Sequence, residues 1–175
     1  MPLVDHAIAR VQVGTPEVAV NVHHGRRRLE AHLDGRAHLS VESQEALGTA
    51  GALGQLRGWI DGRPVLVTNA DAWLPDRAAV VALLDGWDGV NTRLLTVEHG
   101  APADFGTRRY CGVALLPWSE VRDLEAVPSG LYEVRWRAAA ARGELELVDH
   151  DGPFVDCGTP ADYLAANLLA SGGSR

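Results

Sequence analysis

The stretch from Pro64 to Trp73 constrains the fold of this chain more than any other. Its core, Val65 to Thr68, is a run of aliphatic and β-branched residues, which is typical of a buried strand. The run ends in Asn69 and Asp71, and a helical pattern begins near Asp76. Ligands bind at the carboxyl ends of the strands in open α/β sheets, so Asp71 lies where a catalytic or metal-binding carboxylate is expected. A turn or a helix cap explains the same Asp equally well.

Composition and charge limit the class of protein. The 175 residues are enough for one domain with its own core, and the formal net charge is −7. Surfaces that bind nucleic acid are basic, so we expect no nucleic-acid partner. All 16 basic residues are Arg, which removes Lys as a phosphate ligand. Two Cys are too few for a disulfide framework, and no membrane-length apolar run or signal-peptide pattern is present, so we expect a cytoplasmic protein without a membrane partner.

Strand patterns and helix patterns alternate along the chain. Strands are predicted at residues 17–22, 37–42, 65–68, 92–97, 110–116, 145–148 and 154–155. Helices are predicted from 3 to about 14 and at 26–33, 50–60, 77–87, 118–124, 131–141 and 160–170, with a loop at 99–107. This alternation predicts one α/β domain over residues 1–170 with a mostly parallel mixed sheet, followed by a flexible tail at 171–175.

A second segment with chemical potential is Glu45 to Leu53, between a predicted strand and a predicted helix. Gly48 and Gly51 lie three residues apart there, and the segment presents backbone N–H groups at a helix N-terminus. Such a place suits an anion or the polar edge of a nucleotide. A tight turn with close helix packing is the alternative. The Gly-Lys-Ser/Thr ending of a phosphate-binding P-loop is absent.

A third segment, Gly152 to Asn167, contains a carboxylate in a similar position. Asp156 ends a short apolar strand directly before a helix, with Thr159 as the predicted N-cap and Pro160 at the first helical position. Asp71 and Asp156 both end strands, so they could converge on one Mg²⁺, which prefers oxygen ligands. Capping is again the alternative interpretation.

Together these segments resemble the sugar-1-phosphate nucleotidyltransferases, also called nucleoside-diphosphate-sugar pyrophosphorylases. The matching segments are PLVDHAIARV, EVAVNVHH, LEAHL, EALGTAGAL, VLVTNADAW and FVDCGTPADYLAAN, of which the last is the most specific. The short segment at 101–112 is similar to the compact bacterial members, such as the N-acetylmuramate-1-phosphate uridylyltransferases. The resemblance implies a Rossmann-like three-layer fold of the nucleotide-diphospho-sugar transferase type.

The resemblance also implies roles for individual residues. Asp71 and Asp156 would hold Mg²⁺ against the α-phosphate of a nucleoside triphosphate, which a sugar-1-phosphate oxygen attacks in line with release of pyrophosphate. The residues implied on the nucleotide side are Glu42, Ser43, Gly48, Thr49 and Asn69, with Gln44 as an alternative reader of the base edge, and those on the sugar side are Tyr110 and Gly112. Many members carry Asn before that Gly, so the Tyr110-Cys111-Gly112 sequence leaves the sugar open.

The largest departure from the family lies at the start of the sequence. Members open with a strand and a Gly-x-Gly-Thr-Arg loop followed by Lys-Pro, and this sequence begins after that point, as a shortened sequence or a truncated relative. The missing strand lies between the strands that here contain Val20 and Val67. We therefore expect two strand edges without partners, a partner chain or dimer that fills the gap, and impaired turnover. The alternatives are a non-catalytic nucleotide-sugar-binding or regulatory protein and, third, a dinucleotide-binding oxidoreductase, which would need a Gly-x-Gly-x-x-Gly fingerprint.

Overall fold

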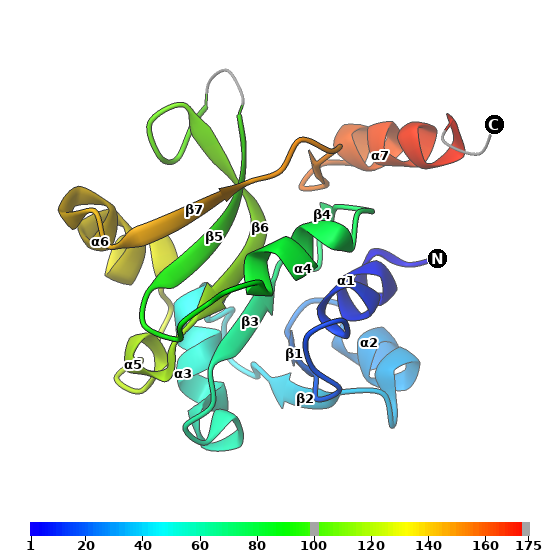
Figure 1. The fold of residues 1–175 in the computed structure, drawn as a ribbon. Helices are drawn as coiled ribbons and strands as arrows, with labels where there is room; N and C mark the ends of the chain where they lie inside the picture. Colours follow the sequence, from blue (N-terminus) through cyan, green and yellow to red (C-terminus); the bar gives the residue numbers. More distant parts are fainter. Residues whose placement is uncertain (99–101, 173–175) are drawn as a thin grey trace.

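The computed structural model describes residues 1–98 and 102–172 (Figure 1). The strands are β1 (Ala19–Val22), β2 (His38–Val41), β3 (Val65–Thr68), β4 (Ala72–Trp73), β5 (Thr92–Glu98), β6 (Arg108–Leu116), β7 (Leu145–Asp149) and β8 (Val155–Asp156). The helices are α1 (Leu3–Val11), α2 (Arg26–Leu33), α3 (Gly48–Ile60), α4 (Ala78–Leu84), α5 (Trp118–Val121), η1 (Tyr132–Trp136), α6 (Arg137–Arg142) and α7 (Pro160–Gly172).

The predicted elements occur in the predicted order, with differences at their ends. Helix α3 begins at Gly48, two residues before the expected start, and the helix predicted at 131–141 opens with the π-helical turn η1. Thr159 caps α7 as predicted, since its Oγ1 accepts a hydrogen bond of 3.2 Å from the Asp162 amide. Helix α7 includes residues 171 and 172, which the sequence assigned to the tail. Residues 99–101 of the predicted loop and 173–175 of the tail lie outside the described residues.

The strands form a mixed sheet rather than a mostly parallel one. The four-stranded part has the order β3-β6-β5-β7, in which β6 runs antiparallel to β3 and β5, whereas β5 and β7 are parallel. Strands β1 and β2 form a separate parallel pair, and β4 and β8 form an antiparallel pair. The mixed α/β class is confirmed. The balance of strand directions differs from the prediction because β6 lies between two neighbours that run the other way.

Helices cover both faces of the four-stranded sheet, which gives the three predicted layers (Figure 1). On one face, α4 packs its Val80 and Leu83 against β5 and β6. On the other face, α3, α5 and η1 pack against the same strands, with Leu53, Val121 and Trp136 among the buried residues. Burial of apolar side chains on both faces explains why these strands have continuous rather than alternating hydrophobic patterns.

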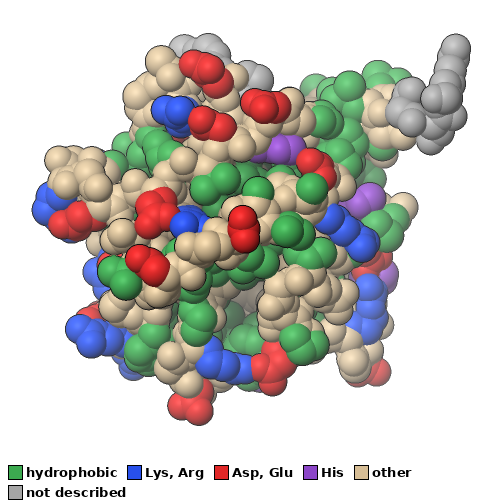
Figure 2. Space-filling view, in the orientation of Figure 1, with side chains coloured by type: hydrophobic (Ala, Val, Ile, Leu, Met, Phe, Trp, Pro, Cys, Tyr) green, Lys and Arg blue, Asp and Glu red, His purple; other side chains and the backbone are tan. Residues whose placement is uncertain are grey.

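The sheet is interrupted between β1 and β3. In the described part of the chain, β1 pairs only with β2 and β3 pairs only with β6. A groove of about 920 Å³, here called the β1–β3 groove, is lined by residues 18–21, residues 64–71 and the facing sides of α1 and α3. In the space-filling view, a hollow bordered by hydrophobic side chains lies near the centre of the face of the molecule that is shown (Figure 2). The prediction of two strand edges without partners is thereby confirmed.

No helix within residues 1–98 and 102–172 combines the length and the apolar character needed to cross a bilayer.

Candidate functional site

The two predicted metal-binding carboxylates lie on neighbouring strands. In the β4–β8 pair, Ala72 is opposite Asp156, and the amide of Cys157 donates a hydrogen bond of 2.9 Å to the carbonyl oxygen of Asp71. Asp71 and Asp156 are therefore diagonal neighbours across one short antiparallel ladder. The structure brings the backbones of Asp71 and Asp156, from distant parts of the chain, next to each other at the end of β3.

The segment between β3 and β4 lies directly against β6. The amide of Asn69 donates a hydrogen bond of 2.8 Å to the carbonyl oxygen of Gly112. Gly112 has φ +78°, and a Cβ there would lie 2.9 Å from the Cβ of Ala72 and 3.2 Å from that of Asn69. Only glycine combines this backbone conformation with so close an approach. Gly112 thus has a structural role in seating the segment that carries Asp71.

A small pocket of about 180 Å³ opens beside this segment. Its lining, here called the β6–β8 pocket, consists of Asn69, Ala72, Asp104, Arg109, Tyr110, Gly112, Phe154 and Asp156. Four of the predicted site residues therefore line one pocket: Asn69, Tyr110, Gly112 and Asp156. Asp71 lines the β1–β3 groove instead, and Asn69 lines both cavities. Asn69, just after β3, therefore borders both cavities.

Arg109 is a pocket residue that the sequence interpretation missed. Its Nη2 lies 3.0 Å from Oδ2 of Asp156, and its guanidinium lies 5.7 Å from the centre of the Phe154 ring. The pair is partly exposed, so it contributes little to stability. A cation here can meet an anionic substrate or neutralise Asp156. The sequence signal was strand alternation, which sends Arg109 to the opposite face from Arg108.

Glu42 and Ser43 differ in how the fold uses them. Glu42 is buried, and its carboxylate accepts hydrogen bonds of 2.9 Å from Asn21 Nδ2 and 3.1 Å from the amide of Leu47. The Glu42 carboxylate therefore anchors the turn before α3. Ser43 is exposed and is not among the residues that line the β1–β3 groove. Glu42 lines the groove with its carboxylate already engaged in these two hydrogen bonds, whereas Ser43 does not line it.

The loop at the start of α3 is a packed turn rather than an open anion site. The amides of Ala50 and Gly51 donate hydrogen bonds of 3.0 and 3.4 Å to the carbonyl oxygen of Ser129. Gly48 has φ +68°, and a Cβ there would lie 2.6 Å from the same oxygen. Thr49 Oγ1 accepts a hydrogen bond of 3.1 Å from the amide of Leu131. The alternative of a tight turn with close packing therefore holds for the amides of Ala50 and Gly51, and Gly48 and Thr49 line the groove.

Tyr110 directs its ring into the core. The ring packs edge-on against Trp136, with 4.9 Å between the ring centres. The hydroxyl is buried without a hydrogen-bond partner among the described residues, and burial raises the pKa of Tyr110 far above its ordinary value. The backbone of Tyr110 is fixed instead by Asp104, whose Oδ2 accepts a hydrogen bond of 2.8 Å from the Tyr110 amide. The Tyr110 hydroxyl is therefore not offered to a sugar.

The carboxylates present suit one type of metal centre. No group of three or more His, Cys, Asp and Glu side chains that could hold a metal occurs within the residues that the structure describes. Mg²⁺ is commonly held by one or two carboxylates, with waters and substrate phosphates completing an octahedron. Asp71 and Asp156 match that donor set, which is one that a substrate must complete.

Comparisons with known proteins identify the fold. No family model and no curated protein matches the sequence. The structure is similar to a protein assigned as a glucose-1-phosphate thymidylyltransferase from Bacillus anthracis, solved with sucrose, with a TM-score of 0.76, 18% identity, and coverage of 97% of this chain and 82% of that one. The chain has the fold of a nucleotidyltransferase.

Two further structures support the same assignment of fold. The inositol-1-phosphate CTP transferase from T. maritima aligns with a TM-score of 0.74 and 14% identity over 96% of this chain and 82% of that one. HddC from Yersinia pseudotuberculosis aligns with a TM-score of 0.69 and 15% identity over 94% of this chain and 84% of that one. At such identities the likeness shows a nucleotidyltransferase fold, and the chemistry must be argued from the site.

Proposed function

We propose that this nucleotidyltransferase-fold protein transfers a nucleoside monophosphate from a nucleoside triphosphate to a sugar-1-phosphate or a similar phosphate. The observation that supports the proposal is the pairing of β4 with β8, in which Ala72 is opposite Asp156 and the Cys157 amide donates to the Asp71 carbonyl oxygen, so that the backbones of the two Asp residues are adjacent. In the reaction, a phosphate oxygen of the acceptor forms a bond to the α-phosphorus. The bond from that phosphorus to the bridging oxygen breaks, and pyrophosphate leaves with the electron pair.

The chain's own residues divide into two groups around Asn69. Asp71 faces the β1–β3 groove, together with Gly48 and Thr49, which suits the nucleotide. Asp156 and Arg109 face the β6–β8 pocket, which suits the acceptor phosphate. Mg²⁺ bound by Asp71 and Asp156 would neutralise charge on the phosphates as the new bond forms. When both substrates are present, the Arg109 guanidinium leaves the Asp156 carboxylate and pairs with the acceptor phosphate.

A second function is favoured by one observation. Arg109 pairs with Asp156, so a carboxylate expected to bind metal has a cationic partner within the chain. A protein that binds a nucleotide sugar without turnover would keep such a pair. The two functions differ in whether Mg²⁺ strengthens nucleotide binding and whether pyrophosphate is released.

The proposal extends to location and assembly. Cys111 and Cys157 are both free thiols, which supports a reducing compartment such as the cytoplasm. A homo-oligomer is supported by α7, whose Tyr163, Leu164 and Leu168 are exposed. Equilibrium sedimentation of the wild-type chain against a Leu164→Ser, Leu168→Ser variant tests this assembly, and a monomeric wild-type chain excludes it.

The test of function is a pyrophosphate-release assay with a panel of nucleoside triphosphates and sugar-1-phosphates. We expect weak, Mg²⁺-dependent turnover that Asp71→Asn abolishes. Binding of a nucleotide sugar with no pyrophosphate release from any pair would favour the second function. Turnover that survives both Asp71→Asn and Asp156→Asn would exclude the proposed site.

A further inference from the structure

Arg10 of α1 is buried beneath the segment that carries the candidate site. Its side chain is only 1% exposed. Its Nε and Nη2 donate to Thr68 Oγ1 at 3.2 and 2.7 Å, and Nη2 also donates to the carbonyl oxygen of Asn69 at 3.1 Å. Its Nη1 donates to the carbonyl oxygens of Ala72 and Leu74 at 3.1 and 3.3 Å. All five N–H donors of the guanidinium therefore hold the stretch from Thr68 to Leu74.

Every one of these acceptors is neutral. Among the described residues, no carboxylate forms an ion pair with Arg10. Burial lowers the pKa of Arg10 to about 10, so the group still carries its charge at neutral pH. A buried cation without a counter-ion is a costly way to stabilise a fold. The arrangement instead gives the planar guanidinium a fixed geometry against five oxygen contacts.

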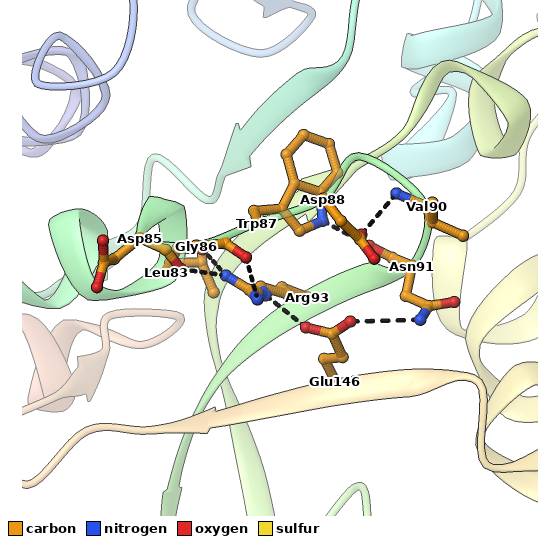
Figure 3. Close-up of polar contacts among 9 residues, drawn as sticks. All are labelled: Leu83, Asp85, Gly86, Trp87, Asp88, Val90, Asn91, Arg93 and Glu146. Atoms are coloured by element: carbon orange, nitrogen blue, oxygen red, sulfur yellow. Dashed lines mark hydrogen bonds and ion pairs between the residues drawn. The ribbon is translucent and has the colours of Figure 1, made fainter.

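Arg93 shows what an arginine in a purely structural role looks like in the same protein. Its guanidinium donates to Glu146 at 2.5 Å and to the carbonyl oxygens of Asp85 and Gly86 just beyond α4 (Figure 3). It therefore has a carboxylate partner and carbonyl acceptors beside the C-terminus of a helix, both of which favour a cation. Arg93 connects α4 to β5 and β7, away from the Asp71 segment. Arg10 has no such compensation and holds only that segment.

The stretch held by Arg10 is also fixed from its other side. The carbonyl oxygen of Gly112 in β6 accepts a hydrogen bond from the Asn69 amide. The amide of Cys157, just after β8, donates a hydrogen bond to the carbonyl oxygen of Asp71. Asp71 thus lies on a short backbone span with Arg10 below it and β6 and β8 beside it. Loss of the Arg10 contacts would let this span shift while β3 and β6 stay paired, since Val65 to Thr68 keep their own ladder to β6.

We propose that Arg10 is a positioning residue, which sets the place of Asp71 relative to Asp156 by clamping the Thr68–Leu74 backbone. This role rests on the proposed metal-dependent transfer at the Asp71–Asp156 pair. Loss of residues that orient metal ligands commonly weakens metal binding about 10- to 100-fold. The planar geometry of the Arg10 guanidinium, rather than its charge, is what positions the backbone, so lysine does not replace it.

The first test needs no ligand. Hydrogen exchange of the Cys157 amide reports the bond to Asp71, and amides of Val113 to Leu116 in β6 serve as an internal reference. We expect Arg10→Lys and Arg10→Met to raise the Cys157 exchange rate about tenfold or more over that reference. Thr68→Val, which removes one acceptor without touching a charge, should give a smaller increase in the same direction. Arg93→Lys is the matched control and should leave the ratio unchanged.

The second test measures Mn²⁺ affinity by electron paramagnetic resonance, with the full chain and no other ligand. We expect about tenfold weaker binding in Arg10→Lys and Arg10→Met, and wild-type affinity in Arg93→Lys. Wild-type affinity and exchange in Arg10→Lys would overturn the clamp, as would an equal effect of Arg93→Lys. If Arg10→Met fails to fold, Arg10→Lys and Thr68→Val carry the test.

The outcomes separate this role from the proposed function. If the wild-type chain binds no Mn²⁺, even with millimolar nucleoside triphosphate, the proposed function fails and the positioning role fails with it. If the wild-type chain binds Mn²⁺ and Arg10→Lys binds it equally well, only the role of Arg10 is overturned.

Discussion

The carbonyl oxygen of Asp71 accepts a hydrogen bond of 2.9 Å from the amide of Cys157, the residue after Asp156. With Ala72 opposite Asp156, this bond makes the separation of the two Asp backbones a property of strand pairing. Strand pairing fixes backbone positions more tightly than a free loop would, as a metal site shared with a substrate requires.

The first prediction concerns this carboxylate pair. Asp71→Asn should weaken Mg²⁺-dependent nucleotide binding by about tenfold or more, because one of two anionic metal ligands becomes neutral. Isothermal titration with and without Mg²⁺ measures the effect. Asp76→Asn is the control: Asp76 Oδ1 accepts a hydrogen bond of 2.8 Å from the amide of Ala78 at the start of α4, a role that Asn also fills. Equal losses in the two variants would show that Asp71 has no special role.

The second prediction concerns Arg109, whose effect on metal and on substrate should have opposite signs. Arg109→Met frees Asp156, so Mn²⁺ alone should bind several-fold more tightly. The same change removes a cation from the β6–β8 pocket, so sugar-1-phosphate should bind several-fold more weakly. Arg108→Met is the matched control, because Arg108 pairs with Asp149 of β7 at 2.6 Å instead. Weaker Mn²⁺ binding in Arg109→Met would contradict the competition described here.

The third prediction concerns two glycines of α3. Gly48→Ala should destabilise the protein by about 1–3 kcal/mol, because of the positive φ and the nearby Ser129 oxygen. Gly58→Ala should stabilise it by about 0.5–1 kcal/mol, since Gly58 is helical and a Cβ there meets nothing within 4 Å. Denaturant unfolding measures both changes in the free energy of unfolding, provided that the m-value of each variant equals that of the wild type. An unchanged stability for Gly48→Ala would contradict the packing against Ser129.

The fourth prediction is a loss of stability at alkaline pH that depends on Cys111. Burial raises the pKa of the Cys111 thiol from 9.0 to about 12. Between these values the folded state keeps a proton that the unfolded state has lost. The free energy of unfolding therefore falls as pH rises above about 9, with a slope approaching about 1.4 kcal/mol per pH unit for this group. Urea unfolding of wild type and Cys111→Ala from pH 8 to 10 measures the slope, which should be shallower in the variant. Parallel curves would show that Cys111 does not contribute.

Local patterns were enough to predict most of the elements, whereas the Asp71–Asp156 metal site stays a prediction. The aliphatic run before Asp71 and the Thr159-Pro160 cap after Asp156 both depend on neighbours in the chain, and both have the expected structure. The family resemblance supplied the pairing of the two carboxylates, and the β4–β8 ladder places their backbones next to each other.

Contacts between distant segments could not be predicted from the sequence. Ser129 occupies the N-terminal donors of α3, and nothing in the Gly48–Leu53 pattern distinguishes that arrangement from an open anion site. The Arg10 clamp depends on how α1 packs against β4. From the sequence alone, an Arg in a helix with apolar neighbours is predicted to be a surface residue. Arg109 could be placed on a strand face but its partner Asp156 could not.

The last prediction concerns the β1–β3 groove, which has two strand edges and an apolar lining. An added N-terminal strand that fills the groove should raise the melting temperature, because it pairs with both edges and buries apolar surface of α1 and α3. Turnover is a separate matter, because the amides of Ala50 and Gly51 at the start of α3 are bonded to Ser129 and do not form a cradle of N–H groups for the triphosphate. A Gly-x-Gly-Thr-Arg loop after the added strand would supply such a cradle.

Three proteins therefore make the comparison: the wild-type chain, the chain with an added strand and a Ser-Ala loop, and the chain with the same strand and a Gly-x-Gly-Thr-Arg loop. Both additions should raise the melting temperature alike, since they share the strand. Only the glycine-containing loop should raise pyrophosphate release, by on the order of a hundredfold, because aligned N–H donors act on the transferring phosphoryl group. Comparable turnover in all three would show that the cradle is dispensable and that the proposed mechanism is wrong. No gain in melting temperature from either strand would show that the groove does not accept one.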